Sequence, residues 1–380
     1  MNMSLRNIAI IVVLVKILQL VVPFISFQIL PFQLESAYRG DNLGYPSDEP
    51  IGWKTTFKTW DASSYLYLAK NGYEVGGIAN QMPPLFPFLI NLAKRVVGSF
   101  TIAGLMLNNL FSFLALIGLY QLTRSYYDEA VASKTILYAL CFPSSFFFSR
   151  VYSEGLFLCL TVFLFYFLSR HKYGRAALCA LLLPLARTIG VFIVLPVLAY
   201  LFFDKKGAVK AQGEGADTFK KITVCVAPLF GLSIAMFFFY QTTGNWFELF
   251  EAHRINASQH SIANLFRLKE WLYDNFIHLH WQWHGTDNSA FDRLAFFLFL
   301  ILLYRIFREQ NMTMFVYALV FGMVPALSDH FMSYARFLII IFPLFIQMAL
   351  DFRHHRIILA LMLLSQLKLL AFHSLGYWVA

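Results

Sequence analysis

The chain has 380 residues, of which 59% are hydrophobic, 18% aromatic and only 13% charged, whereas an ordinary soluble domain is roughly 25% charged. So few charged side chains cannot cover a protein of this size with a polar surface, and the 42 phenylalanines exclude a disordered chain. The net charge of +9 does not indicate nucleic-acid binding, because Lys and Arg lie in short loops between apolar runs. We therefore predict an all-α integral membrane protein with one multi-pass domain, residues 1–380.

Eleven apolar runs could each cross the roughly 30 Å hydrocarbon layer as a helix. The count has a range of 10 to 13, because several runs are shorter than the roughly 20 residues that a span prefers. The first run follows Arg6 without a small-residue cleavage site, so we expect an uncleaved anchor. In chain order the runs are 8–30, 101–122, 134–149, 153–169, 175–186, 188–203, 222–240, 291–307, 312–327, 336–350 and 356–372.

Positive charge predicts the orientation, because short cytoplasmic loops collect Lys and Arg. A cytoplasmic N-terminus puts the basic loops inside only if 175–203 is divided near Pro184 and Arg187 into two spans. The loops then assigned to the inside carry Arg170, Lys172, Arg175, Lys205, Lys206, Lys210, Lys220, Lys221, Arg305, Arg308, Arg353 and Arg356.

Two long segments, 31–98 and 241–290, are then extracytoplasmic loops. Counting 82–97 as a span would reverse every later loop, so we predict an interfacial or re-entrant helix there. The second loop holds Trp246, Trp271, Trp281 and Trp283, a density that is also typical of an aromatic belt at headgroup level.

Ionisable residues from distant parts of the chain fall at the outer ends of the predicted spans. Each one alone is more typical of a side chain that snorkels to the interface, but together they predict one cavity at the outer leaflet. Arginine suits a lipid phosphate, and a nearby carboxylate could act as a general base. The residues are Asp61, Arg150, Glu154, Arg187, Glu248, Glu251, His253, Arg254, Asp329, His330 and Arg336.

Several sequence blocks resemble, in order and spacing, the GPI mannosyltransferase 2 (PIG-V-like) family. The first and most specific is Trp60-Asp61-Ala62-Ser63-Ser64-Tyr65, followed by Pro84-Leu85-Phe86-Pro87. The others are Pro143-Ser144-Ser145 with Tyr152-Ser153-Glu154-Gly155, Leu185-Ala186-Arg187-Thr188, Gly244-Asn245-Trp246, and Ser333-Tyr334-Ala335-Arg336-Phe337 with Phe342-Pro343.

This resemblance implies a glycosyltransferase of the GT-C superfamily. Such an enzyme moves a sugar, usually mannose, with inversion, from a polyprenyl- or dolichyl-phosphate donor to a lipid or glycan acceptor on the non-cytoplasmic side. Asp61 would be the catalytic base, and no metal or other cofactor is expected. The remaining partners are membrane lipids, and nucleic acid is not among them. The residues expected to bind substrate are Trp60, Tyr152, Glu154, Arg187, His253, Arg254, His330 and Arg336.

The chain departs from the family pattern at two positions, because Ser64 stands where a His usually follows and Ile189 where an Asn does. Both changes could alter acceptor contacts. They indicate an acceptor other than a GPI glycolipid. The compact chain is consistent with a bacterial or archaeal homologue in the plasma membrane, and a eukaryotic source would place the protein in the endoplasmic reticulum.

Two other functions stay open. A transporter or flippase of a lipid-linked sugar needs polar groups at the midplane. The candidates there are Lys16, which we expect to snorkel toward the cytoplasm, Gln19 and Lys368. The third possibility is a structural subunit that positions another enzyme.

Overall fold

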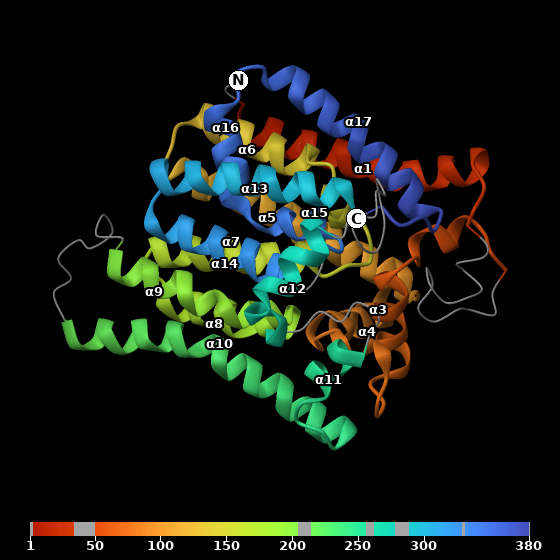
Figure 1. Cartoon of the computed structure of the whole chain (residues 1–380), viewed down its shortest axis with the longest axis horizontal. Helices are drawn as coiled ribbons and strands as arrows, with labels where there is room; N and C mark the ends of the chain where they lie inside the picture. The colour runs from red at the N-terminus through yellow and green to blue at the C-terminus, as the bar shows by residue number, and fades with distance from the viewer. Residues whose placement is uncertain are drawn as a thin grey trace.

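The computed structural model describes residues 3–33, 50–203, 214–255, 262–277, 289–328 and 331–379. In these ranges the regular elements are all helical, which confirms the all-α prediction for this part of the chain (Figure 1). The α-helices are α1 (Leu5–Ile29), α3 (Asp61–Asn71), α4 (Leu85–Val97), α5 (Phe100–Arg124), α6 (Glu129–Cys141), α7 (Glu154–Ser169), α8 (Tyr173–Ala186), α9 (Val194–Phe203), α10 (Glu214–Thr243), α11 (Glu248–Ile255), α12 (Leu268–Leu272), α13 (Ala290–Glu309), α14 (Met312–Leu327), α15 (Tyr334–Phe337), α16 (Phe342–Asp351) and α17 (His355–Ser374). Short turns of tighter or wider helix are η1 (Trp53–Phe57), η2 (Ile78–Gln81), η3 (Ser145–Ser149), η4 (Thr188–Ile193), η6 (Ile262–Phe266), η7 (Tyr273–Ile277) and η8 (Leu338–Ile340).

Four helices in the described part of the chain are long and apolar enough to cross a membrane: α1, α5, α10 and α17. A fifth candidate is the pair Tyr334–Ile340 and Phe342–Asp351, counted as one bent span. Each of the eleven predicted runs contains a helix, but eleven spans are not confirmed, because the other helices are shorter or carry more charge. Length and composition thus fit insertion into a membrane through several helices.

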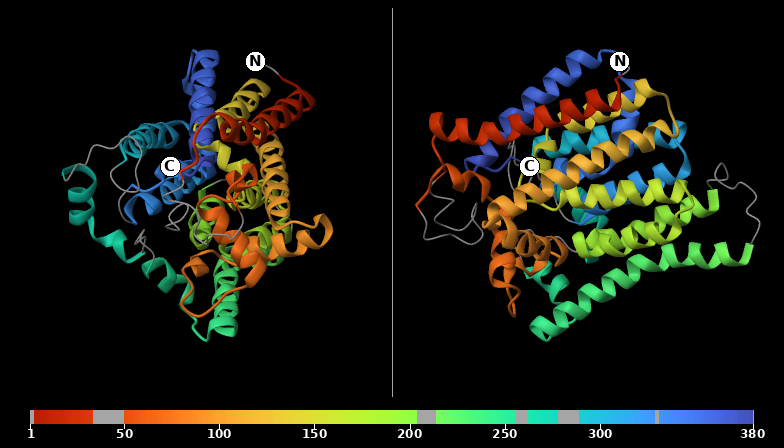
Figure 2. Two further views of the ribbon diagram at one scale, coloured as in Figure 1. Left: turned by 90° about the vertical axis from the view of Figure 1, so that its right-hand side faces the viewer. Right: turned by 180° about the vertical axis from the view of Figure 1, so that it is seen from behind.

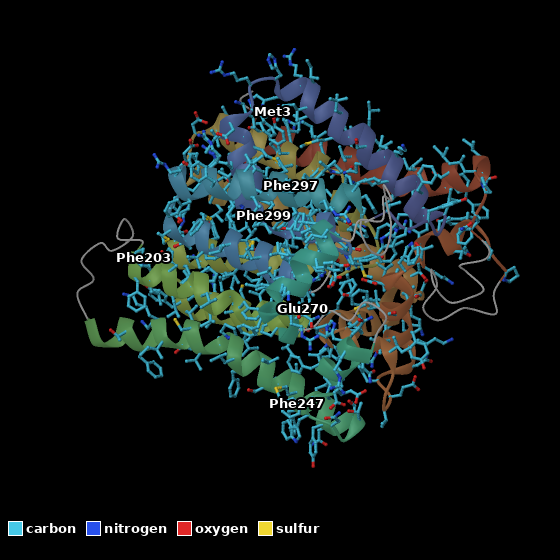
Figure 3. All side chains as sticks on the ribbon, viewed as in Figure 1. Met3, Phe203, Phe247, Glu270, Phe297 and Phe299 are labelled. Atoms are coloured by element: carbon cyan, nitrogen blue, oxygen red, sulfur yellow. The ribbon has the colours of Figure 1, made fainter. Side chains whose placement is uncertain are left out.

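The apolar helices lie side by side with similar axial directions (Figures 1 and 2). Helix α8 packs against α7 and α10, α5 packs against α7, and α1 packs against α17. The chain reverses at short connections, and Phe203, at the end of α9, marks one end of the bundle in Figure 3. The short helices α3, α4 and α11 gather near the opposite end (Figure 2). Asp61, Glu154, Arg187 and Arg336 also lie toward this end of the bundle.

Two predicted spans are wrong as continuous helices. The run 134–149 breaks because α6 ends at Cys141 and η3 follows Pro143. The run 336–350 bends by 85° between η8 and α16, just before Pro343. Pro143 disfavours the helical conformation of Phe142 before it, and α6 ends there. Pro343 lies in the first turn of α16, where proline is favoured because its missing N–H would have no partner, so it marks the start of a new helix.

The structure confirms a helix break near Pro184 and Arg187, because α8 ends at Ala186 and η4 begins at Thr188. The two helices on either side are too short to be counted as spans by length, so the division into two spans stays a prediction. A Cβ at Gly190 would lie only 2.4 Å from the carbonyl carbon of Leu183. Glycine thus lets the chain turn back tightly against the end of α8.

Helix α4 covers most of the run 82–97, which we predicted to be an interfacial or re-entrant helix. It begins after two prolines and is amphipathic, with Phe86 and Ile90 buried and with Lys94 and Arg95 in its last turn. Its 13 residues reach only about 20 Å, less than the roughly 30 Å of the hydrocarbon layer. Helix α4 is therefore too short to be a span.

Lys16 does not snorkel, contrary to the prediction. Its ammonium group is buried and donates to Ser112 Oγ at 2.7 Å, to Asn109 Oδ1 at 3.2 Å and to the Phe148 carbonyl at 3.2 Å. The acceptors belong to α5 and η3, so the Lys16 side chain joins α1 to these two elements.

Candidate active site

Four ionised side chains form a continuous chain of contacts between distant segments. Arg336 Nη1 donates to Asp61 Oδ2 at 2.6 Å, and Arg336 Nε donates to Glu154 Oε1 at 2.5 Å. Arg187 Nη1 lies 2.6 Å from the same Glu154 oxygen. The order Asp61, Arg336, Glu154, Arg187 alternates in charge, so the four groups balance.

Burial separates the two carboxylates. The Glu154 side chain is 1% exposed and lies between both arginines, while the Asp61 side chain is 33% exposed. Oδ1 of Asp61 makes no hydrogen bond to any residue that the structure describes. Glu154 therefore serves as the internal counter-ion of the arginines, and Asp61 is the carboxylate that can meet a substrate.

The start of each helix helps to position these carboxylates. Asp61 is the first residue of α3 and Glu154 the first of α7, where the helix dipole favours negative charge. Asn108 of α5 holds the turn before α7, because its Nδ2 donates to the Arg150 carbonyl at 2.8 Å and its Oδ1 accepts from Gly155 N at 2.9 Å. A Cβ at Gly155 would lie 2.3 Å from that Asn108 oxygen, so the glycine after Glu154 permits the contact.

Arg336 is held by its own short helix. Asp292 is fully buried at the start of α13, and its Oδ1 accepts from Ala335 N at 2.8 Å. The guanidinium of Arg336 lies over the Tyr152 ring, 4.5 Å from its centroid, and 5.1 Å from the centroid of Phe147. Such cation–π contacts add to the ion pairs and fix the plane of the group.

Two residues beside the site have backbone conformations that side chains disfavour. Trp60, before Asp61, has φ 58°, and Ser333, three residues before Arg336, has φ 54°. Non-glycine residues in such regions cost on the order of 1–3 kcal/mol each and often cluster at functional sites. Here they adjoin the carboxylate and the guanidinium that contact each other.

A small cleft of about 20 Å³ opens beside the Asp61–Arg336 pair. Its walls come from the start of α3, the segment before α7, the start of α15 and the end of α17 with the residues after it. The lining residues are Trp60, Asp61, Tyr152, Ser333, Arg336, His373, Trp378 and Val379.

Helix α11 brings His253 close to this cluster. Glu248, on the same helix, accepts from Gly76 N at 2.9 Å and from Asn80 Nδ2 at 2.7 Å, which docks α11 on the segment between α3 and α4. Burial, with a further contribution from the positive charge of Arg187, lowers the pKa of His253 to about 4, although Asp61 opposes the shift. His253 is therefore neutral at pH 7 and could donate or accept a hydrogen bond.

The structure thus brings six of the nine predicted site residues together: Trp60, Asp61, Tyr152, Glu154, Arg187 and Arg336, with His253 nearby. Arg254 is exposed on α11 and is not among the residues that line the cleft. His330, like Asp329, lies outside the described residues.

Arg150 has a different place from the one predicted. It is completely buried, its Nη2 donates to the Thr56 carbonyl, and no described carboxylate pairs with it. Its guanidinium also lies 5.1 Å from the centroid of Phe57. Arg150 therefore braces the segment that leads to Asp61 and does not join the ion-pair chain.

Sequence reasoning missed Asp292, His373 and Trp378. Asp292 is an acid in the first turn of an apolar helix, a signal that could have been read from the sequence. No pattern in the sequence around His373 and Trp378 indicates that they line a cleft together with Trp60 and Asp61. That return depends on the packing of α17 against α1.

Comparison with known proteins finds no family model that matches the chain and no significant match among curated proteins. The family resemblance of the sequence blocks therefore stays a prediction. Chemically, the cleft offers one accessible carboxylate, guanidinium groups beside it, and aromatic walls.

Proposed function

We propose that the chain is a GT-C-type glycosyltransferase that moves a sugar, mannose by the family resemblance, from a polyprenyl- or dolichyl-phosphate donor to a lipid or glycan acceptor. The reaction would take place on the extracytoplasmic side. The observation that carries the proposal is the meeting of Asp61 and Arg336 at one cleft, from positions 275 residues apart.

In the proposed reaction the acceptor hydroxyl oxygen forms a bond to C1 of the sugar. The C1–O bond to the phosphate breaks, and its electron pair leaves with the polyprenyl phosphate. Asp61 Oδ1 takes the hydroxyl proton, because Oδ2 is already bonded to Arg336. General-base assistance of this kind contributes about 10²–10⁴-fold in rate, and attack from the side opposite the phosphate inverts the anomeric carbon.

Guanidinium groups at the cleft support a phosphodiester donor. Arg336 lines the cleft, and Arg187 lies beside it through their shared partner Glu154. A guanidinium so placed could stabilise the negative charge of a sugar phosphodiester and of the departing phosphate.

The test replaces Asp61 by Asn, which keeps the shape of the side chain and removes the base. In liposomes with polyprenyl-phosphate mannose and a lipid-glycan extract as acceptor, we expect sugar transfer to fall about 10²–10⁴-fold. The matched control is Asp351→Asn, which removes an aspartate paired with Arg305 at 2.7 Å near the other end of the bundle. Near wild-type transfer by Asp61→Asn would show that this carboxylate is not the base.

A transporter or flippase of a lipid-linked sugar is the second candidate, favoured by the buried Lys16 and Gln19 of α1. Gln19 exchanges hydrogen bonds with Ser149 and Gln366, so a polar network joins α1 to η3 and α17. A flippase would move labelled lipid-linked sugar across liposome membranes without releasing polyprenyl phosphate. Lys16→Met would then stop that movement, whereas it would leave sugar transfer by a glycosyltransferase measurable.

A further inference from the structure

A short stretch ahead of α13 packs against the segment that carries Arg336. Helix α12 and η7 together make up this stretch, residues 268–277. Within it the side chain of Asn275 is completely buried. Buried polar groups in proteins are normally hydrogen-bonded, so the partners of this amide show which parts of the chain the stretch holds together.

Asn275 links residues 268–277 to the segment before α15. Its Oδ1 accepts from Phe331 N at 2.9 Å, and its Nδ2 donates to the Trp271 carbonyl at 2.9 Å. Because one partner is a donor and the other an acceptor, only one orientation of the amide satisfies both. The side chain thus holds a backbone N–H that lies five residues before Arg336.

Helix α13 closes these contacts into a ring. Arg293 Nε donates to the Asn275 carbonyl at 2.8 Å, and the neighbouring Asp292 Oδ1 accepts from Ala335 N at 2.8 Å. The path from α13 through Asn275 and Phe331 to Ala335 therefore returns to the helix at the adjacent residue. A polar network whose members are all hydrogen-bonded makes a structure more rigid, and here it encloses residues 331–335.

Trp271 supports the same segment through its ring. Its Nε1 donates to the Ala326 carbonyl at 2.6 Å, near the end of α14. The ring meets that of Phe331 edge to face, with centroids 5.8 Å apart, and Phe331 packs in turn on Tyr334 of α15 at 5.5 Å. Residues 268–277 thus contact the segment before α15 through both a hydrogen bond and aromatic rings.

The enclosed segment contains the strained turn that presents Arg336. Ser333 has φ 54°, and its carbonyl accepts from Arg336 N at 3.0 Å. A non-glycine residue keeps such a conformation only when the surrounding structure over-determines it. Asn275 holds the chain before this turn and Asp292 holds it after the turn, so the two side chains fix it from both sides.

We propose that Asn275 is a positioning residue for Arg336. By holding the amide of Phe331, it fixes the turn from which the Arg336 guanidinium reaches Asp61. Asn275 is not among the residues that line the cleft, so it acts through Arg336 and not on a substrate. The expected effect on rate rests on the proposed glycosyl transfer, whereas the positioning itself is measured without turnover.

Hydrogen exchange read by mass spectrometry on the full chain in nanodiscs measures the positioning. Asn275→Leu keeps the size of the side chain and removes both polar atoms, so we expect amide exchange in a peptide covering 331–337 to rise about 5- to 30-fold. The matched control is Asn245→Leu, which removes an amide oxygen that accepts from Phe247 N at 2.9 Å before α11. This control should leave exchange in 331–337 unchanged.

Asn275→Asp is the conservative variant. Its carboxyl group keeps the acceptor for Phe331 N, and burial favours the protonated form, whose hydroxyl donates to the Trp271 carbonyl as the amide does. In the transfer assay Asn275→Leu should lower kcat by up to about 10²-fold and leave the acceptor KM within about twofold, because a displaced Arg336 stabilises the departing phosphate less. Asn275→Asp should restore both kcat and the slow exchange of 331–337.

The outcomes separate the positioning role from the proposed reaction. Faster exchange in 331–337 of Asn275→Leu, without any transfer by the wild-type protein, would retain the role and remove the enzymatic proposal. Unchanged exchange in that variant would overturn the role. If the variant did not fold, the wild-type protein would decide, because slow exchange of the Phe331 amide supports the bond to Asn275 and fast exchange contradicts it.

Discussion

Among the ionised side chains of the site, Glu154 contributes most to its stability. It is almost fully buried and contacts both Arg187 and Arg336 through a single oxygen. Removing one partner of a buried ion pair costs about 3–5 kcal/mol, because a charge stays buried without compensation. Glu154 is therefore more important for the stability of the site than the more exposed Asp61.

We expect Glu154→Gln to lower the free energy of unfolding by about 3–5 kcal/mol, since two buried guanidiniums would share one carboxylate. Thermal unfolding of the purified protein in detergent measures the loss. The control Glu129→Gln changes a carboxylate that lies 4.0 Å from Arg124 and is 38% exposed, and it should cost less than about 1 kcal/mol. Equal losses in both variants would contradict the role of Glu154 as the counter-ion.

Breaks between helices position the charged residues of the site. The connection between α6 and α7, the turn at Arg187 and the segment before the bend at α16 each place a charged residue at the end of the bundle that holds the cleft. If the helix continued without a break, the charged residue would lie beyond the site. The shortest described α-helix, α15, holds Arg336 and depends on Asp292 for its orientation.

Asp292→Ala removes the acceptor for Ala335 N, so we expect a stability loss of about 1–3 kcal/mol and a large fall in sugar transfer as Arg336 moves. Asp292→Asn keeps an acceptor oxygen and should rescue much of the activity. The comparison is Asp128→Ala, which removes the cap that accepts from Val131 N at 2.7 Å at the start of α6. That variant should lose stability, by about 0.5–2 kcal/mol, and keep its activity. If Asp292→Ala kept full activity, Arg336 would not depend on this cap.

The protein as a whole separates its charges between two ends. The ion-pair chain and the cleft lie at one end, with α3, α4 and α11 nearby (Figure 2). Toward the other end Arg305 pairs with Asp351, and Tyr120 donates to the carbonyl of Met3. Arg170 and Arg353, in the described connections after α7 and α16, and Arg308, in the last turn of α13, lie toward this second end.

Single cysteines in a cysteine-free background test the orientation. We expect Val75→Cys, at a site that is 78% exposed in the first outer loop, to react with an impermeant thiol reagent applied to intact cells. Ser125→Cys, which is exposed after α5 at the other end, should react only after the membrane is opened. The reverse pattern would place the cleft in the cytoplasm.

Composition and local pattern were sufficient for several features of this protein. Apolar runs predicted helices and a membrane environment, and basic loops predicted the helix break at Arg187, because hydropathy and charge act on each segment separately. The ionisable residues at the outer ends of these runs indicated a common site, and Asp61, Glu154, Arg187 and Arg336 do contact one another.

Other features came from the packing of distant segments. Proline signals did not reveal how far α16 turns from η8, and the pattern around Lys16 did not show the acceptors that α5 offers. The return of Trp378 to Trp60 follows from contacts of α17 with α1. Such contacts depend on the shapes of surfaces that meet only after the chain has folded, so no local run of residues encodes them.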